Sequence, residues 1–303
     1  MYVGSCIVAR DGQQRKQEAR ERARIRREEE RRKARQRKIY VYAGSFVAVA
    51  AVIVAVVLVA LNNKGTDKNI NLAATPSITT SLSNIPAANY DTVGIGTSSG
   101  GVLPVTGQPA LTANGKPEVL YVGAEYCPYC AAERWAMVTA LSRFGTFSGL
   151  ETTASSSKDV FPSTATLSFL HATFTSDYIT FTTKETQDRA GKKLQALSSA
   201  EEATFSAIAP KGGIPFFDIA NKYYVNGAQY DPGVLKGLTA EQIATQAGNP
   251  STDVGKGVLG SANLITAAIC KATNNQPTAV CNSSAVTSVA GSLTGGSTDG
   301  SSS

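Results

Sequence analysis

Histidine is almost absent from this 303-residue chain, with His171 as its single copy. The sequence therefore contains no Ser-His-Asp arrangement, and it offers few of the imidazole ligands that zinc sites use. It also lacks a glycine-rich phosphate-binding loop and a paired-carboxylate motif. No motif in the sequence therefore supports hydrolytic or nucleotide-dependent chemistry. His171 itself lies in an alternating stretch, so we predict a packed residue rather than a catalytic base.

Positive charge is scarce outside the N-terminal tail. The net charge is +6, but residues 1–40 hold 14 Lys/Arg and 6 Asp/Glu, which leaves 15 Lys/Arg and 17 Asp/Glu beyond them. The near-neutral remainder predicts a main domain that binds no nucleic acid. The basic tail, residues 1–39, has charged pairs at helical spacing, such as Glu18 and Arg22. These favour a solvated helix, and contact with anionic lipid head groups is the alternative.

Residues 40–61 carry no charge over 22 positions and are dominated by Val and Ala. At about 1.5 Å per residue such a helix spans roughly 33 Å, which is enough for the hydrocarbon core of a bilayer. We predict one transmembrane helix that serves as an uncleaved signal anchor. The basic flank predicts a single-pass protein of the cytoplasmic membrane with its N-terminus in the cytoplasm and its main domain outside.

Beyond the membrane segment the composition changes twice. Residues 62–115 are rich in Ser, Thr, Asn, Ala and Gly, and they predict a flexible spacer. Residues 116–281 have the periodic patterns of a folded α/β domain, and residues 282–303 predict a disordered Ser/Gly tail. Strands are expected at 118–123, 165–174, 178–183, 216–220 and 223–228, and helices at 128–144, 199–209, from 239 onward and at 257–270.

Details of the patterns define some of these elements more closely. Ala131, Trp135, Val138 and Leu141 predict one buried face on the helix at 128–144. Two helix starts have the sequence of a capping box, Ser199 with Glu202 and Thr239 with Gln242.

The most informative motif is a Cys-x-x-Cys pair, Cys127 and Cys130, which directly follows an apolar run. A first cysteine at the start of a helix is exposed to unpaired N–H groups and the helix dipole, both of which favour a thiolate. Cys127 is therefore the predicted nucleophile and Cys130 the predicted resolving thiol of a thiol–disulfide exchange site. A zinc half-site, which requires two more ligands, and an inert disulfide are the alternatives.

A second cysteine pair, Cys270 and Cys281, makes the number of cysteines beyond the predicted membrane segment even. An even number is expected in an oxidising compartment. We predict a structural disulfide that holds the last helix. The alternative is a redox relay that passes electrons to or from Cys127 and Cys130.

The order of the expected elements resembles the thioredoxin fold over residues 115–250. The most specific resemblance lies in residues 124–130 and in the Ile214-Pro215 dipeptide before a late strand. The resemblance implies a central mixed sheet flanked by helices, here with a C-terminal helical extension. It also implies that Pro215 is preceded by a cis bond and faces the cysteines.

The same resemblance implies a substrate-binding role for Ile214, Pro215, Tyr126 and Tyr129. The Pro-Tyr dipeptide between the cysteines is similar to that of glutaredoxins, which are moderately oxidising couples. Cytoplasmic thioredoxins carry a buried acid in the strand before the cysteines, and the aligned position here is Tyr121. Glu125 can take over this function only if it points inward.

The domain also resembles a narrower group, the membrane-anchored thioredoxin-like family called domain of unknown function 929. Residues 168–176, 213–222 and 262–270 carry this resemblance. It implies a fold and a location more than an activity.

Together these features predict a membrane-tethered, extracytoplasmic thiol–disulfide oxidoreductase that acts on exported protein thiols or disulfides. No bound cofactor is expected, because the cysteine sulfurs carry the electrons, and a membrane redox partner is compatible with this scheme. The alternative is a non-enzymatic, thioredoxin-like scaffold or binding module with a static disulfide.

Overall fold

The computed structural model describes residues 73–74, 76–99 and 101–293. The predicted basic tail and membrane segment lie outside these residues. Of the helices that are described, none has the length and apolar character needed to cross a bilayer.

A mixed β-sheet lies at the centre of the domain, with strand β4 (Lys116–Gly123) in its interior. This strand coincides with the predicted apolar strand at 118–123. It pairs in parallel with one neighbour, β9, and antiparallel with another, β10, so the sheet is mixed as predicted. The remaining strands of the sheet are β2 (Leu103–Pro104), β3 (Thr112–Ala113), β9 (Thr180–Glu185), β10 (Phe216–Ile219) and β11 (Tyr223–Asn226).

Two smaller sheets accompany the central one. One has the order β1-β6-β7 and the other pairs β5 with β8. Their bounds are β1 (Ala73–Ala74), β5 (Gly145–Ser148), β6 (Glu151–Ala154), β7 (Ala165–Ser168) and β8 (Thr173–Ser176). The single strand predicted at 165–174 is therefore wrong, because a turn separates β7 from β8. His171 lies in this turn with its side chain 62% exposed and pairs with Glu151, so the prediction of a packed histidine is also wrong.

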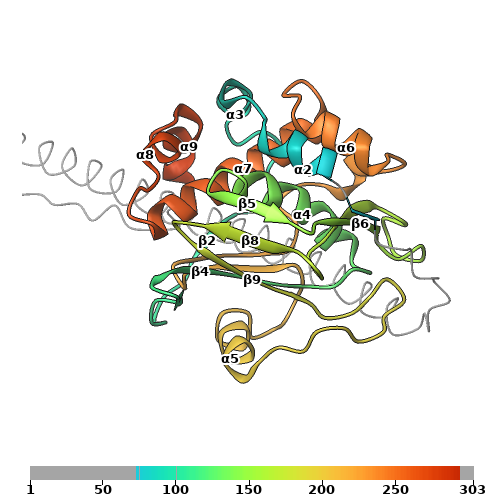
Figure 1. The fold of residues 1–303 in the computed structure, drawn as a ribbon, viewed down its shortest axis with the longest axis horizontal. Helices are drawn as coiled ribbons and strands as arrows, with labels where there is room; N and C mark the ends of the chain where they lie inside the picture. The colour runs from blue at the N-terminus through green and yellow to red at the C-terminus, as the bar shows by residue number, and fades with distance from the viewer. Residues whose placement is uncertain (1–72, 75, 100, 294–303) are drawn as a thin grey trace, which may run out of the picture. The chain divides into compact units, whose positions relative to one another are not determined.

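Helices cover both faces of the central sheet (Figure 1), with α5 on one side and α4 and α7 on the other. Side chains alternate between the faces of a strand. Accordingly, Val119 and Tyr121 belong to the large core with α4 and α7, whereas Leu120 and Val122 pack in the smaller cluster with α5. The helices of the described residues are α2 (Pro76–Ser83), α3 (Ala87–Val93), α4 (Pro128–Leu141), α5 (Ser199–Ile208), α6 (Ala240–Ala247), α7 (Asp253–Ala272), α8 (Thr278–Cys281) and α9 (Ser284–Val289), with 3-10 turns at Pro232–Leu235 and Ala290–Leu293.

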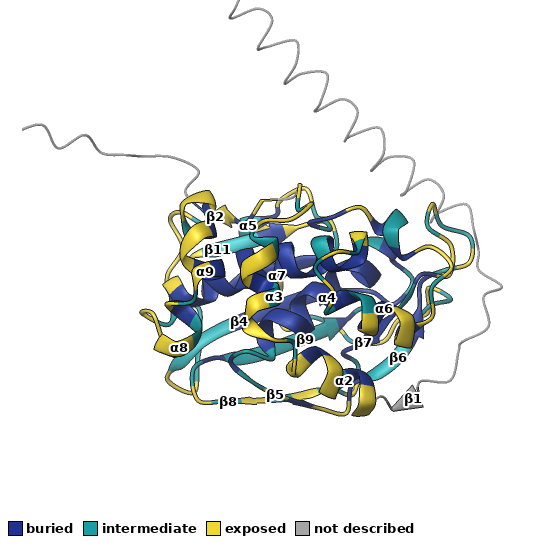
Figure 2. Cartoon of the chain, turned by 90° about the horizontal axis from the view of Figure 1, so that it is seen from above, coloured by how far each residue is buried: buried dark blue, intermediate teal, exposed yellow. Residues whose placement is uncertain are grey.

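Helix α4 is buried on all sides, and Figure 2 shows it dark blue together with most of α7. The prediction of one buried face is therefore too narrow. Helices α7 and α2, strand β7 and the 3-10 turn at Pro232–Leu235 pack around α4, and Val119 and Tyr121 of the central sheet belong to the same core. Two charged side chains, Glu133 and Arg134, are consequently completely buried in this helix.

The prediction of a flexible spacer at 62–115 is wrong from Pro76 onward. Helices α2 and α3 pack onto the core through Ile78, Leu82 and Tyr90. The side chain of Asn263 in α7 fixes the end of α3 by donating hydrogen bonds to the carbonyls of Tyr90 and of Gly94, the residue that follows the helix. Tertiary packing of a few apolar side chains thus orders a segment of otherwise polar composition.

The prediction of a disordered tail at 282–303 is wrong for its first part. Helix α9 and the 3-10 turn after it bury Ala285, Val286, Val289 and Leu293 against the core. Residues 294–303 lie outside the described part of the chain.

Helix caps and turns agree more closely with the sequence. The predicted capping box of Thr239 and Gln242 begins α6, whereas the box of α5 is formed by Ser198 and Glu201, one residue earlier than predicted. The strands predicted at 216–220 and 223–228 are present as β10 and β11, which pair antiparallel as a hairpin. Helix α5 ends at Ile208, before Pro210 as expected.

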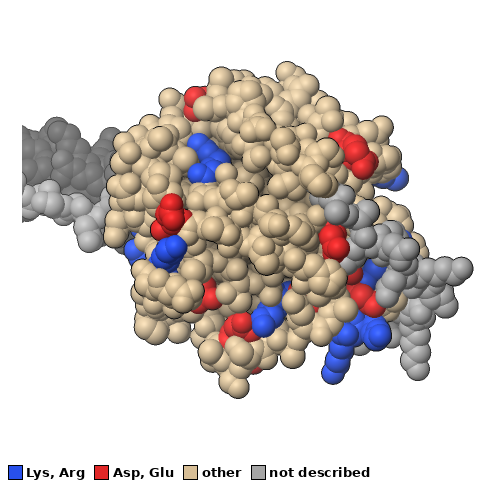
Figure 3. All heavy atoms as spheres, in the orientation of Figure 1, with Lys and Arg blue, Asp and Glu red and all other residues tan. Residues whose placement is uncertain are grey.

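Charged side chains are sparse and mixed on the face that Figure 3 shows. Basic and acidic groups are interspersed on a mostly uncharged surface. This distribution agrees with the near-neutral composition of the chain beyond residue 40.

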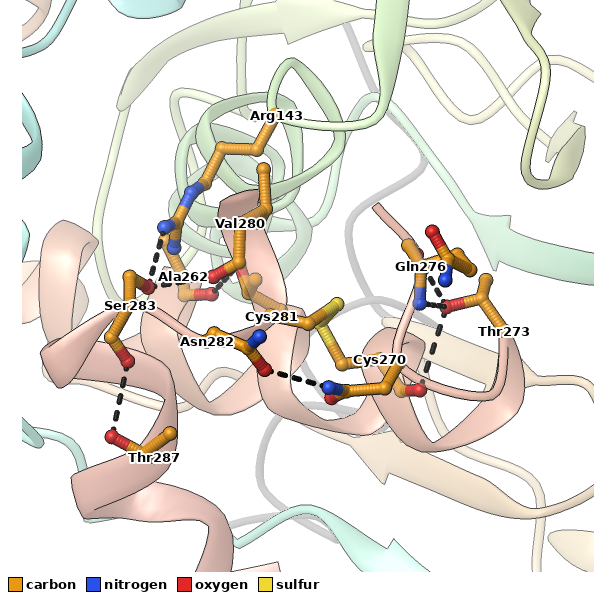
Figure 4. The surroundings of a disulfide bond; sticks show 12 residues. Arg143, Ala262, Cys270, Thr273, Gln276, Val280, Cys281, Asn282, Ser283 and Thr287 are labelled. Carbon is orange, nitrogen blue, oxygen red and sulfur yellow. Dashed lines mark hydrogen bonds between the residues drawn. A yellow bond between two sulfur atoms is a disulfide. The ribbon is translucent and has the colours of Figure 1, made fainter. Parts of the chain in front are cut away.

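The predicted disulfide between Cys270 and Cys281 is present and joins the end of α7 to α8 (Figure 4). Both cysteines are buried. Next to the bond, Arg143, which follows α4, donates a hydrogen bond to the Ser283 hydroxyl at 3.1 Å. The disulfide therefore lies at the C-terminal end of α4.

Replacing both cysteines, Cys270→Ala with Cys281→Ala, is expected to lower the free energy of unfolding by about 3 kcal/mol, because closing a loop of this length restricts the unfolded chain. Denaturant unfolding monitored by circular dichroism measures this loss. A variant as stable as the wild type would contradict the structural role. Loss of thiol exchange at Cys127 without a loss of stability would favour the relay.

Candidate functional site

Cys127 is the N-cap residue of α4. Its sulfur accepts a hydrogen bond from the backbone N–H of Cys130 at 3.3 Å, and Pro128 occupies the first helical position. Proline is well suited there because the N–H that it lacks has no helical partner. The sulfur therefore takes the position of the oxygen in an ordinary N-cap, facing the unpaired N–H groups of the first turn. This geometry confirms the predicted placement of the first cysteine at a helix start.

The two thiols differ in their acidity. Burial tends to raise the pKa of Cys127, but hydrogen bonds from Cys130 and the positive charge of Arg134 outweigh it and hold the pKa below its ordinary value. Burial and the hydrogen bond to Cys127 raise the pKa of Cys130 well above its ordinary value. Cys127 is 4% exposed and Cys130 is completely buried. Both thiols are thus buried, and Cys127 is the more acidic of the two.

The segment before β10 passes directly over the first cysteine. The Cys127 thiol lies 3.8 Å from the carbonyl oxygen of Ile214 as a hydrogen-bond donor. The bond between Ile214 and Pro215 is cis, and Pro215 is buried while Ile214 is partly exposed. The structure thus places Ile214 and Pro215 next to the cysteine pair, as the resemblance implies.

Aromatic side chains form the rim of the site. Tyr126 and Tyr129 are both partly exposed. The Tyr129 ring meets Phe161 edge to face with the centroids 5.8 Å apart. Phe161 belongs to the loop between β6 and β7, whose Ser156 N–H donates to the Tyr126 carbonyl at 2.8 Å. No sequence signal pointed to Phe161, because the loop is polar around it and lies more than 30 residues after the cysteines.

A buried ion pair lies beneath the cysteines. Arg134 of α4 donates two hydrogen bonds to the Glu185 carboxylate at the end of β9, at 2.9 and 2.7 Å. A third bond from Arg134 reaches the carbonyl of Ala124 at 2.9 Å. Both side chains are completely buried. Sequence reasoning missed this pair, although a charged residue one turn after Cys130 in an apolar helix was a signal for it.

The resemblance pointed to positions 121 and 125 as places for a buried acid. Tyr121 is completely buried and contributes no carboxyl group to the site. Glu125 does point inward, because it is buried and accepts a hydrogen bond from Ser168 at 2.7 Å. Burial raises the pKa of Glu125 above its ordinary value.

The second cysteine pair is not part of this site. Helix α4 has 14 residues, about 21 Å at 1.5 Å per residue, with Cys127 at its start and the Cys270–Cys281 disulfide near its end. In the described part of the chain, no three His, Cys, Asp or Glu side chains gather into a group that could hold a metal ion. The zinc half-site therefore lacks its further ligands there.

Residues 105–212 match the family model of the domain of unknown function DUF929. The matched part includes both cysteines of the motif and the Arg134–Glu185 pair, and it ends before Ile214. No curated protein matches the chain, and no solved structure does.

The asymmetry of the two thiols predicts their reactivity toward iodoacetamide in the reduced, full-length protein. Cys127 is expected to be the modified residue, with a rate that rises at a pH below the ordinary thiol pKa of about 8.5. Cys130 is expected to remain unmodified while the protein is folded. Peptide mass spectrometry over a pH series measures both rates, with Cys127→Ser as the control. Faster modification of Cys130, or a Cys127 pKa at or above the ordinary value, would contradict this assignment.

Proposed function

We propose that this protein is a thiol–disulfide oxidoreductase, with Cys127 as the nucleophile and Cys130 as the resolving thiol. The observation that carries the proposal is the N-cap geometry, in which the Cys127 sulfur receives the Cys130 N–H and faces the Ile214 carbonyl. A thiolate at a helix start, with a protonated thiol one turn below, is the arrangement that disulfide exchange requires.

The exchange itself can be written with atoms and electrons in balance. The Cys127 thiolate attacks one sulfur of a client disulfide, forming a mixed disulfide and releasing the other client sulfur as a thiolate. The Cys130 sulfur then attacks Cys127, its proton passes to a departing client sulfur, and a Cys127–Cys130 disulfide forms. Two electrons move from the protein dithiol to the client, and the reverse sequence oxidises a client dithiol.

The strand arrangement supports a thioredoxin-like fold for this site. Strand β9 pairs with β4 in parallel and β10 pairs with it antiparallel, which makes the central mixed sheet that the resemblance implies. Helix α4 follows β4 directly, and the cis proline precedes β10. The backbone beside Pro215 then borders the cysteines, where an extended client segment can lie next to Cys127.

The location proposed for this activity is outside the cytoplasmic membrane. The proposal rests on the uncharged segment 40–61, its basic flank and the Cys270–Cys281 disulfide, which is typical of oxidising compartments. Exported proteins are the proposed clients, and a membrane protein is the proposed electron partner. Contact of the basic tail with anionic lipids would hold the anchor at the inner surface.

A second candidate is a scaffold in which the Cys127–Cys130 pair forms a static disulfide. The low exposure of the pair, 4% and 0%, favours this candidate, because a client sulfur has little access to it. The trapping experiment below distinguishes the two.

Replacing the resolving thiol, Cys130→Ala, is expected to stop the exchange at the mixed disulfide. The reduced, full-length variant, in a Cys6→Ser background that removes the cysteine outside the two pairs, is mixed with a synthetic peptide that carries one internal disulfide. Intact mass spectrometry is expected to show an adduct of one peptide that dithiothreitol removes. The wild type is expected to reduce the peptide without accumulating the adduct.

The matched control is Cys127→Ala, which retains the buried thiol and loses the nucleophile, and it is expected to form no adduct. An absence of adduct in Cys130→Ala, together with a wild type that leaves the peptide oxidised, would favour the scaffold.

A further inference from the structure

The guanidinium of Arg134 shares a hydrogen-bond acceptor with the nucleophilic cysteine. Arg134 Nη2 donates to the Ala124 carbonyl at 2.9 Å, and the backbone N–H of Cys127 donates to the same oxygen at 3.3 Å. The arginine also lies one turn after Cys130 on α4. A single carbonyl therefore links the position of the guanidinium to that of the cysteine motif.

Glu185 is fixed from the neighbouring strand. In the parallel pairing of β4 with β9, Glu185 is opposite Gly123, the last residue of β4. Its carboxylate accepts hydrogen bonds from Nε and Nη2 of Arg134. It also accepts a hydrogen bond from the backbone N–H of Phe169 at 3.3 Å. The ion pair is thereby held rigidly at the base of the site.

A fully buried ion pair contributes little net stability to a core. Removing two charges from water carries a large desolvation penalty, and apolar side chains of similar volume often stabilise a protein as well or better. Here the pairing is also incomplete. Arg134 Nη1 and the Tyr121 hydroxyl are buried without a hydrogen-bond partner among the described residues, and the guanidinium lies 5.8 Å from the Tyr121 ring.

The charge of Arg134 acts on both sulfurs. The guanidinium lowers the pKa of Cys127 and opposes the rise in the pKa of Cys130. Besides the ion pair itself, the ionisable groups around the cysteines are Tyr121 from β4, Glu125 and Tyr126 before α4, Tyr129 in α4, and Asp159 and Asp188 from the loops. Arg134 is the cation beside them.

We propose that the Arg134–Glu185 pair tunes the thiol–disulfide equilibrium of Cys127 and Cys130 from beneath. Arg134 is a positioning residue that stabilises the reduced, thiolate form, and Glu185 limits that effect by neutralising it. This inference rests on the proposed function, since it assigns a role within the same exchange site.

The two members of the pair are expected to have opposite effects when they are replaced. In Arg134→Met the thiolate loses its cation, so the pKa of Cys127 rises and the equilibrium with glutathione shifts toward the protein disulfide. In Glu185→Gln the cation is left unneutralised, so both quantities shift the other way. We expect about a tenfold change in the equilibrium constant in each case, which corresponds to about 30 mV for a two-electron couple.

The experiment uses the full-length protein in a Cys6→Ser background, which removes the cysteine outside the two pairs. The Cys127 pKa is read from thiolate absorbance against pH. The equilibrium constant is read from glutathione titrations resolved by peptide mass spectrometry. Arg143→Met is the matched control, because Arg143 follows the other end of α4 and stacks on Tyr90 at 4.5 Å. It is expected to leave both quantities as in the wild type.

A purely structural ion pair would lower the stability of both variants and leave the Cys127 pKa and the equilibrium unchanged, and this result would overturn the inference. Shifts of the same sign in the two variants would also overturn it. If a single replacement does not fold, the apolar pair Arg134→Met with Glu185→Met removes both charges together. That variant is expected to shift in the direction of Arg134→Met, and a wild-type equilibrium in it would reject the proposal. A wild type that never equilibrates with glutathione would instead reject the proposed function.

Discussion

The register of the strands on either side of β4 fixes where each group of the cysteine site lies. Val122 pairs with Phe216 on one side, which places Ile214 and Pro215 beside the residues that follow β4. Gly123 is opposite Glu185 on the other side. A slip of one residue in either pairing would turn the facing side chains to the opposite surface of the sheet. The pairing of β4 with its two neighbouring strands thus determines which residues surround the cysteine motif.

Burial is the second constraint on this site. The motif begins a helix with no exposed face, so the Cys127 sulfur meets solvent only at the N-terminal end of α4. In such an environment a thiolate is costly unless nearby dipoles and charges stabilise it. The N–H groups of the first turn provide one part of that stabilisation, and the buried guanidinium provides another. Packing and chemistry are therefore coupled, because the groups that fill the core around α4 also set the properties of the sulfur.

The sequence predicted the parts of this site that are local along the chain. The strand, the Cys-x-x-Cys pair and the helix start are adjacent, and the disulfide followed from the even number of cysteines. Helices α2 and α3 were missed because only a few apolar side chains, including Tyr90, hold their polar segments to the core. The Arg134–Glu185 pair was missed because it joins residues 51 positions apart, and a single sequence gives no register between β4 and β9.

The equilibrium reduction potential of the Cys127–Cys130 pair, titrated against glutathione buffers in the full-length protein, tests the central claim most directly. Catalytic couples lie between about −270 and −120 mV. The account predicts a value within that range. A pair that stays oxidised below about −300 mV would be a structural bond, and this result would contradict the assignment of the site as an exchange centre.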